Sequence, residues 1–274
     1  MIIVENHGLA FVHIPKCAGT TVREQLVKLD DTASQFAGVQ THPELGRIDY
    51  MHLPLGVLAQ YFPDTFELLT RLDVYAITRD PQARFQSSVS EYLKRIQNRR
   101  MAELSRADLQ NVVEEVIGKL EDAPEVFPYE IAHFTPQCAY IFHQDQQVAQ
   151  HTFALDLIET IFAELAQRTG IDIDTKAWSN QDFVLRFEGL KKSIWGINDI
   201  ARSLLPYRGY QALKRIARPV LVRNRSTPVA NELFASDKIK AFVRDYYAED
   251  ARQYAADLNK ELPQPGQLRR AAGL

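Results

Sequence analysis

The chain of 274 residues carries a formal net charge of −3, with 46% apolar and 24% charged residues, which is ordinary for a globular protein. An acidic chain is not expected to be a general nucleic-acid binder, and no run of about 18 apolar residues predicts an integral membrane segment. Two cysteines, Cys17 and Cys138, are too few for a secreted disulfide framework. Because the N-terminus also lacks a signal-peptide pattern, we expect a cytoplasmic protein, or one from which an anchor has been removed.

The first predicted unit is a strand, a loop and a helix. Residues 9–14 form a short apolar run rich in β formers that ends at Pro15, which is typical of a buried strand. After the loop, Thr20 or Thr21 is expected to act as the N-cap of a helix, whose buried face begins at Val22.

A second unit of the same kind follows. Residues 74–78 predict a strand, Arg79 and Asp80 a turn, and Pro81 suits the first position of a helix. Further strands are expected over residues 153–157 and 183–187, and further helices over residues 104–120, 157–169 and 236–259. This alternation predicts an α/β fold with a mostly parallel sheet flanked by helices, followed by a flexible tail over residues 262–274.

The first loop has the features of an anion site. Backbone N–H groups at a helix N-terminus bind anions, Lys16 adds a positive charge, and the threonines add hydroxyl donors. The order of residues in this loop differs from that of a Walker loop, because Lys16 precedes Gly19, whereas in a Walker loop the lysine follows the last glycine. Because no acidic strand end is evident to hold magnesium, a nucleoside triphosphate is a poor candidate. The alternative is a tight turn that only packs the strand on the helix.

The second turn offers a complementary pair of donors. Arg79 stands at the carboxyl end of a predicted strand, where α/β proteins bind ligands, and Ser87 lies two turns into the following helix. Together they can bind one phosphate from two sides. Alternatively, Asp80 is simply the N-cap of that helix.

These two stretches resemble the PAPS-dependent sulfotransferases, which use 3′-phosphoadenosine-5′-phosphosulfate, and in particular their carbohydrate sulfotransferase branch. The stretch FVHIPKCAGTT, residues 11–21, is similar to the family's first loop, and RDPQARFQS, residues 79–87, is similar to its second motif. The resemblance implies a P-loop-like parallel sheet flanked by helices, in a single sulfotransferase domain over residues 1–261 with a helical insertion on the acceptor side.

The resemblance also implies the cofactor-binding residues. The 5′-phosphosulfate would lie on Lys16, Cys17, Ala18, Gly19, Thr20 and Thr21, and the 3′-phosphate on Arg79 and Ser87. The stretch VRNRS is similar to a late loop of the family and would bring Arg223 and Arg225 to the cofactor. The product would be adenosine 3′,5′-bisphosphate.

Cys17 departs from the family pattern, which has a hydroxyl residue at this position. A thiol beside a lysine at a helix N-terminus can have a lowered pKa and be reactive. A lone cysteine more often fills space, and we favour that interpretation.

Sulfuryl transfer requires a base for the acceptor hydroxyl and a positive charge for the departing phosphate. Lys16 is the natural group for the second task, and no metal is required. The candidate bases are His13, His42, His52, His133 and the carboxylates. By resemblance we favour His52, which stands just before a helix begun by a proline and between the two cofactor motifs. His42 is the next candidate.

The acceptor is expected to be a hydroxyl compound, by resemblance a carbohydrate. Between residues 202 and 225 the chain carries basic residues with interleaved tyrosines and no acid. This stretch predicts contacts with an anionic glycan or with the cofactor phosphates, or else a solvated surface.

Two other functions stay open: a P-loop kinase-like transferase, and a non-catalytic nucleotide-binding protein. The sequence does not indicate the oligomeric state.

Overall fold

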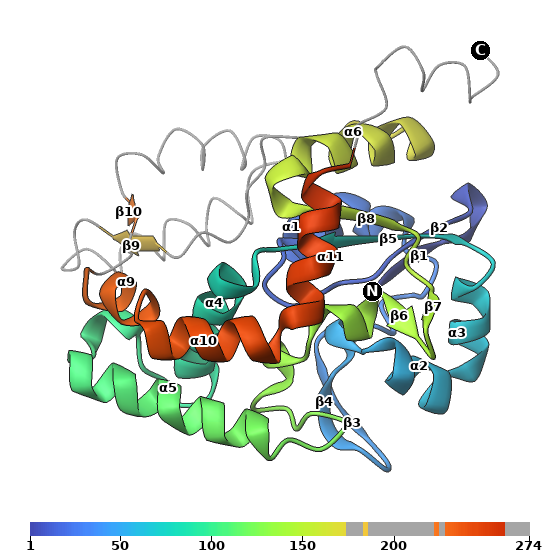
Figure 1. The fold of residues 1–274 in the computed structure, drawn as a ribbon. Helices are drawn as coiled ribbons and strands as arrows, with labels where there is room; N and C mark the ends of the chain where they lie inside the picture. Colours follow the sequence, from blue (N-terminus) through green and yellow to red (C-terminus); the bar gives the residue numbers. More distant parts are fainter. Residues whose placement is uncertain (174–182, 186–221, 225–227, 261–274) are drawn as a thin grey trace. The chain divides into compact units, whose positions relative to one another are not determined.

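The structure is a computed structural model that describes residues 1–173, 183–185, 222–224 and 228–260 (Figure 1). The chain divides into two compact units, one formed by Met1–Ser179 with Val229–Leu274 and the other by Asn180–Pro228. The predicted tail lies outside the described residues. So does most of Asn180–Pro228, from which the structure describes the backbone of two short strands and Pro228, the first residue of a helix.

The larger unit is an α/β structure built on one mixed sheet with strand order β1-β2-β5-β8. The strands are β1 Ile2–Val4, β2 Leu9–Phe11, β5 Asp73–Thr78 and β8 His151–Ala154. β2, β5 and β8 are parallel, with Leu9 opposite Asp73 and Tyr75 opposite His151. The predicted α/β class is therefore confirmed, although β2 is shorter than expected and residues 155–157 form a 3₁₀ turn.

β1 makes the sheet mixed, and the sequence analysis did not predict this strand. It pairs antiparallel with β2 because only a short 3₁₀ turn, Glu5–His7, and Gly8 separate them. Such a connection is too short for the crossover that parallel neighbours require. Gly8 has a φ of 62°, in the left-handed region that glycine adopts without a steric penalty.

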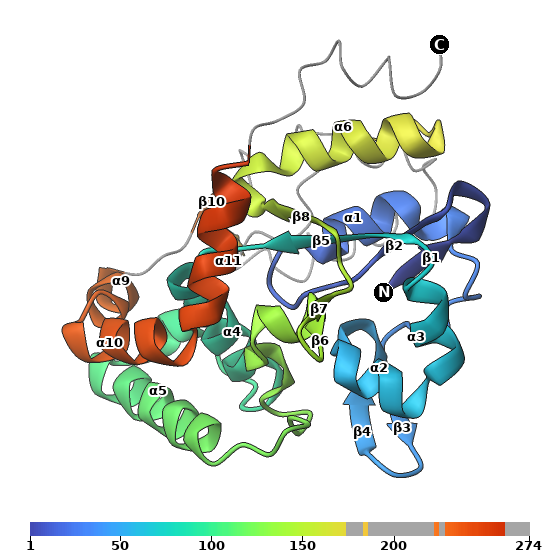
Figure 2. The same ribbon diagram turned by 45° about the vertical axis from the view of Figure 1, so that its right-hand side comes forward.

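Helices flank the sheet, and Figure 2 shows α6 on one side of it and α2 and α3 on the other. The described helices are α1 Gly19–Leu26, α2 Leu55–Tyr61, α3 Pro63–Leu69, α4 Pro81–Arg95, α5 Arg106–Glu121, α6 Ile158–Thr169, α9 Pro228–Phe234, α10 Asp237–Tyr246 and α11 Ala248–Leu258. Among the described residues, no helix is both long enough and apolar enough to cross a membrane.

Two apolar cores hold the larger unit together. The first lies around the sheet, where Phe11, Tyr75 and Phe162 are fully buried. The second joins α4, α5, α9 and α10 around Phe85, and Figure 1 shows α5 and α10 lying alongside each other.

The single helix expected over residues 236–259 is wrong, because the structure divides it into α10 and α11 at Tyr247. The Tyr247 side chain is buried in the second core, and its hydroxyl donates to the backbone oxygen of Phe134 at 2.8 Å. The chain changes direction at this residue. As a result, α10 packs in the second core, whereas α11 packs on β5 and β8.

Three short antiparallel pairs complete the described structure. β3 Val39–His42 pairs with β4 Gly46–Asp49, and β6 Phe142–His143 pairs with β7 Gln146–Gln147. In the smaller unit, β9 Phe183–Leu185 pairs with β10 Val222–Asn224. The strand predicted at residues 183–187 therefore exists, in a sheet separate from the main one.

Candidate functional site

The two motifs identified in the sequence meet in the structure. β2 and β5 are adjacent parallel strands, so the segments that follow them leave the same edge of the sheet. The guanidinium of Arg79 donates from Nη1 to the backbone oxygen of Lys16 at 3.0 Å. A residue after β5 thus holds the loop after β2 in place.

Gln137 connects the same two segments from a third part of the chain. Its side-chain oxygen accepts from the backbone N–H of Arg79 at 2.8 Å and from the Cys17 thiol at 3.2 Å, while its amide donates to the Arg79 oxygen at 2.9 Å. The backbone N–H groups of Gln137 and Cys138 donate in turn to the carboxylate of Asp250, which is buried and also pairs with Arg84. The loop is therefore held by a buried polar network.

The loop enters α1 without the predicted threonine cap. Ala18 occupies the N-cap position with a φ of 58°, and Lys16 also has a positive φ, 64°. These two left-handed residues turn the chain before the helix, so Thr20 and Thr21 lie inside its first turn. The N–H of Thr21 already donates to the Ala18 oxygen at 2.9 Å. Because the first N–H groups of a helix have no partner within it, those of Gly19 and Thr20 are the ones at the start of α1 that suit an anion.

Gly19 is required by close packing against His13. A Cβ built on Gly19 would lie 1.9 Å from Cδ2 of the His13 ring. That ring is buried, its Nδ1 finds no hydrogen-bond partner in the described part of the chain, and burial followed by the neighbouring His52 lowers its pKa well below the ordinary value. His13 is therefore neutral, and its ring packs against the loop at Gly19.

Lys16 contacts an acid that the sequence analysis did not single out. Its ammonium lies 3.1 Å from Oε2 of Glu91 on α4. Burial alone would raise the pKa of Glu91, but Lys16 lowers it below the ordinary value, so the carboxylate is ionised. An anion at this loop would compete with Glu91 for Lys16.

His52 lies beside the loop in a defined tautomer. It ends a 3₁₀ turn, Tyr50–His52, and its Nδ1 donates to the backbone oxygen of His13 at 2.9 Å. A carbonyl oxygen can only accept, so Nδ1 carries the proton and Nε2 keeps its lone pair. Burial, followed by the neighbouring His133, lowers the pKa of His52 to about 3. The ring is neutral at pH 7, as a proton acceptor must be.

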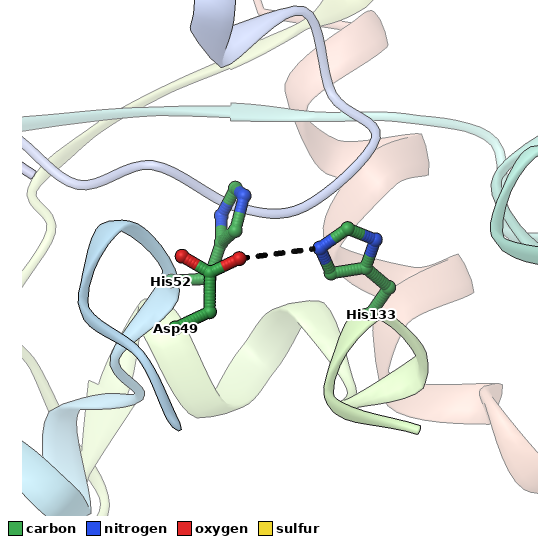
Figure 3. A group of neighbouring side chains, drawn as sticks. All are labelled: Asp49, His52 and His133. Atoms are coloured by element: carbon green, nitrogen blue, oxygen red, sulfur yellow. Dashed lines mark ion pairs between the residues drawn. The ribbon is translucent and has the colours of Figure 1, made fainter. Parts of the chain in front are cut away.

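A second histidine, His133, and the carboxylate of Asp49 complete the cluster shown in Figure 3. The rings of His52 and His133 are 5.0 Å apart between centroids, and Oδ2 of Asp49 lies 3.8 Å from Nε2 of His133. Burial opposes ionisation of Asp49, but His133, His52 and Arg95 lower its pKa to about 2. A buried carboxylate so close to two imidazoles stabilises a proton on either ring.

Asp49, His52 and His133 are close enough to be considered as metal ligands, since their donor atoms lie within 4.8 Å of one another. However, the Arg95 guanidinium lies 3.3 Å from Oδ2 of Asp49 and also contacts Nε2 of His133. A positive charge already occupies this position, so the cluster is poorly suited to a cation.

The other histidine candidate, His42, lies away from this cluster. It belongs to β3, its Nδ1 accepts from the backbone N–H groups of Glu44 and Leu45, and its ring packs against Tyr61 at 5.1 Å. These contacts give His42 a role in the hairpin between β3 and β4. The structure therefore favours His52 over His42 as the residue beside the loop.

Cys17 is a buried filler, as the sequence analysis favoured. The side chain is 1% exposed, and burial raises the pKa of its thiol to about 12. The alternative of a reactive thiolate is wrong, because burial outweighs the nearby positive charges of Arg84, Arg79 and Lys16.

Ser87 is not hydrogen-bonded to Arg79 in the described structure, and the side chains of the late basic residues lie outside it. Ser87 is half-buried on α4, and among the described residues it makes no hydrogen bond with Arg79. Ser88 and Arg84 point inward and donate to backbone oxygens of residues 133–135. Arg223 is described only through its backbone in β10, and Arg225 and the preceding basic stretch lie outside the described residues.

Asp49, Glu91 and Arg95 are site residues that were not predicted from the sequence. A signal for two of them was present, because Ser87, Glu91 and Arg95 are spaced four residues apart and so share one face of α4. Asp49 carried no such signal. It precedes the 3₁₀ turn that carries His52 and caps it by accepting from the Met51 N–H at 3.2 Å.

Comparisons of the chain with protein-family models, with curated proteins and with solved structures found no match. The assignment of a function therefore depends on the residues and geometry described above.

Proposed function

We propose that the chain is a PAPS-dependent sulfotransferase that moves a sulfuryl group to a hydroxyl-bearing acceptor, for which the sequence resemblance favours a carbohydrate. The observation that carries the proposal is the hydrogen bond from Arg79 to the Lys16 oxygen. It joins two motifs that resemble the same family at one edge of a mostly parallel sheet. We take this sheet, with its β2–loop–α1 unit, to be P-loop-like.

The donor groups at this edge suit an anionic cofactor. Lys16, Arg79, the start of α1 and the hydroxyl of Thr20 are all hydrogen-bond donors, and two of them are cations. The cofactor supplies the sulfuryl group when it is bound. In the proposed mechanism Lys16 leaves Glu91 for the phosphate and stabilises the negative charge that develops there.

His52 performs the proton transfer in this proposal. Its Nε2 accepts the proton of the acceptor hydroxyl while its Nδ1 stays bound to the His13 oxygen. The resulting imidazolium is stabilised by Asp49, whose carboxylate is ionised across the physiological range. The structure supports this role through the fixed tautomer and the adjacent negative charge.

The experiment that tests the proposal is thermal unfolding with adenosine 3′,5′-bisphosphate and without magnesium. A ligand at about 100 times its dissociation constant stabilises the folded state by about 2.7 kcal/mol. For a domain of this size, that corresponds to a rise in Tm of roughly 5–10 °C.

ATP with magnesium is the matched comparison, and it should raise Tm much less, because the loop lacks the Walker arrangement. Stabilisation by ATP and magnesium alone, or equally by both ligands, would favour a kinase-like transferase. If the bisphosphate binds but sulfuryl transfer to a panel of hydroxyl acceptors is absent, a non-catalytic nucleotide-binding protein is favoured.

A further inference from the structure

Gln137 contacts both the loop that carries Lys16 and the turn that carries Arg79, although its side chain is 0% exposed. The side-chain amide pairs with both polar groups of the Arg79 backbone, accepting from the N–H at 2.8 Å and donating to the oxygen at 2.9 Å. The same side-chain oxygen accepts from the Cys17 thiol at 3.2 Å. One side chain therefore fixes the distance between the segments that follow β2 and β5.

The bonds of Gln137 differ from the bond that Arg79 makes to the loop. Arg79 contacts the Lys16 oxygen with its guanidinium, the same group that is proposed to bind a phosphate. Gln137 holds Arg79 through its backbone, so these bonds do not use the guanidinium. Because Gln137 has no exposed surface, it acts on a ligand only through the positions of the loop and the turn.

Two helices hold Gln137 in turn. The backbone N–H groups of Gln137 and Cys138 donate to the carboxylate of Asp250 on α11 at 2.8 and 2.9 Å. Asp250 is 1% exposed and pairs with Arg84 on α4 at 3.6 Å. A buried polar network whose members all have partners is rigid. The loop and the turn are therefore held at one separation before any ligand binds.

This separation matters for a ligand with two anionic groups. Such a ligand gains affinity from both segments only if the spacing of its groups matches the separation of the two sites. A bisphosphate with the same charge but another spacing would bind one segment well and the other poorly. Loss of the fixed separation would reduce the difference between these two ligands, because neither would then meet a preformed pair of sites.

We propose that Gln137 is a positioning residue that sets the separation of the two phosphate sites and so selects the 3′,5′-bisphosphate over isomers of the same charge. The inference rests on the proposed function, because it takes the loop with Lys16 and the turn with Arg79 as the phosphate sites. It adds a specificity that positive charge alone does not supply, and the buried residue that determines it.

The test uses two ligands that differ only in the position of one phosphate, adenosine 3′,5′-bisphosphate and adenosine 2′,5′-bisphosphate. Calorimetry measures their dissociation constants for the full chain without magnesium. We expect the 3′,5′ isomer to bind about tenfold or more tightly, since a displaced phosphate loses a hydrogen bond between charged groups. In Gln137→Met, which keeps a side chain of similar length but removes the amide, the two constants should become nearly equal.

The ratio of the two constants separates positioning from folding. A variant that is partly unfolded binds less of both isomers, and the ratio does not change. Gln150→Met is the matched control, because the Gln150 side-chain oxygen accepts from the N–H of Val74 at 3.0 Å, near the opposite end of β5. This change removes a bond of the same kind away from the two sites and should keep the preference.

Cys17→Ala replaces Gln137→Met if the latter does not fold. It removes the bond between the Cys17 thiol and Gln137, and it should also reduce the preference. Equal affinity of the unmodified protein for the two isomers, an unchanged ratio in the variant that folds, or a loss of the preference in Gln150→Met would overturn the inference while the proposed function stands. If the unmodified protein binds neither isomer, the proposed function is wrong and the inference fails with it.

Discussion

A backbone group, not a carboxylate, fixes the tautomer of His52, the proposed base. A backbone oxygen, that of His13, accepts from Nδ1, while the carboxylate of Asp49 lies near the ring without fixing it. The proposed base and the loop before α1 are therefore coupled directly, because His13 also packs on Gly19 at the start of α1. A shift of the loop would move the Nε2 lone pair that receives the proton in the proposed mechanism.

The change His52→Asn tests the role of this residue without removing its hydrogen bond. The Asn amide can still donate to the His13 oxygen, but it cannot accept a proton from the substrate. We expect sulfuryl turnover to fall by about 10²- to 10⁴-fold, as for loss of a general base, with nearly unchanged affinity for adenosine 3′,5′-bisphosphate. Steady-state kinetics and calorimetry measure the two quantities.

His42→Asn is the control for this experiment, since that ring lies in the β3–β4 hairpin and should leave turnover close to that of the unmodified protein. If His52→Asn were as active as the unmodified protein and His42→Asn inactive, the base would have to be His42. Activity in both variants would move the role to His133 or to a carboxylate.

At the scale of the elements, the strand–loop–helix unit depends on one position without a side chain. Gly19 begins α1, and a Cβ there would overlap the buried His13 ring. Gly19→Ala should therefore lower the free energy of unfolding by roughly 1–3 kcal/mol, as overpacking usually does. Urea denaturation measures this change.

Gly118→Ala is the matched control for Gly19→Ala. Gly118 lies within α5, where an added Cβ meets no atom within 4 Å. Replacing a helix-interior glycine with alanine should raise stability by roughly 0.5–1 kcal/mol. If both changes have the same sign and size, the close contact between Gly19 and His13 has no energetic consequence.

The elements themselves were largely predictable, because the apolar patterns of β2, β5, α4, α5 and α6 follow from local sequence. Pro81 and Asp80 mark the start of α4 correctly, with Asp80 accepting from the Ala83 N–H at 2.8 Å. The loop before α1 was not predictable, since nothing in the sequence shows that an alanine will take a left-handed conformation and displace the expected threonine cap.

The site was predictable only in part, for a physical reason. Lys16, Arg79 and His52 lie in short segments whose residue types and order carry information. Asp49, His133 and Arg95, in contrast, become neighbours only because distant elements pack together. Glu91 illustrates the difference, because its spacing on α4 was visible but its pairing with Lys16 required the fold. The same holds for Gln137, which links both motifs from a third segment.

At the scale of the whole molecule, the larger unit contains a concentration of buried neutral histidines. His13 is 4% exposed and His52 8%, and their rings lie 4.2 Å apart between centroids. Burial is the largest cause that lowers the pKa of each, and the same is true of His133. Folding therefore excludes protons that the unfolded chain would bind in mildly acidic solution.

The stability of the protein should consequently fall as the pH is lowered from 7 to 5. For His52 the pKa decreases on folding from 6.5 to about 3, so below pH 6.5 the unfolded state binds a proton that the folded state does not. This one group should cost about 2 kcal/mol between pH 7 and pH 5. The carboxylate of Asp49 does not contribute in this range, because its pKa moves from 3.8 to about 2 and affects stability only below that window.

Urea denaturation of the unmodified protein and of His52→Asn at several pH values measures the effect. We expect the variant to lose about 2 kcal/mol less than the unmodified protein between pH 7 and pH 5, while above pH 7 the two stability curves run parallel. Curves that stay parallel down to pH 5 would mean that His52 becomes protonated in the folded state and that its environment is more polar than the structure describes.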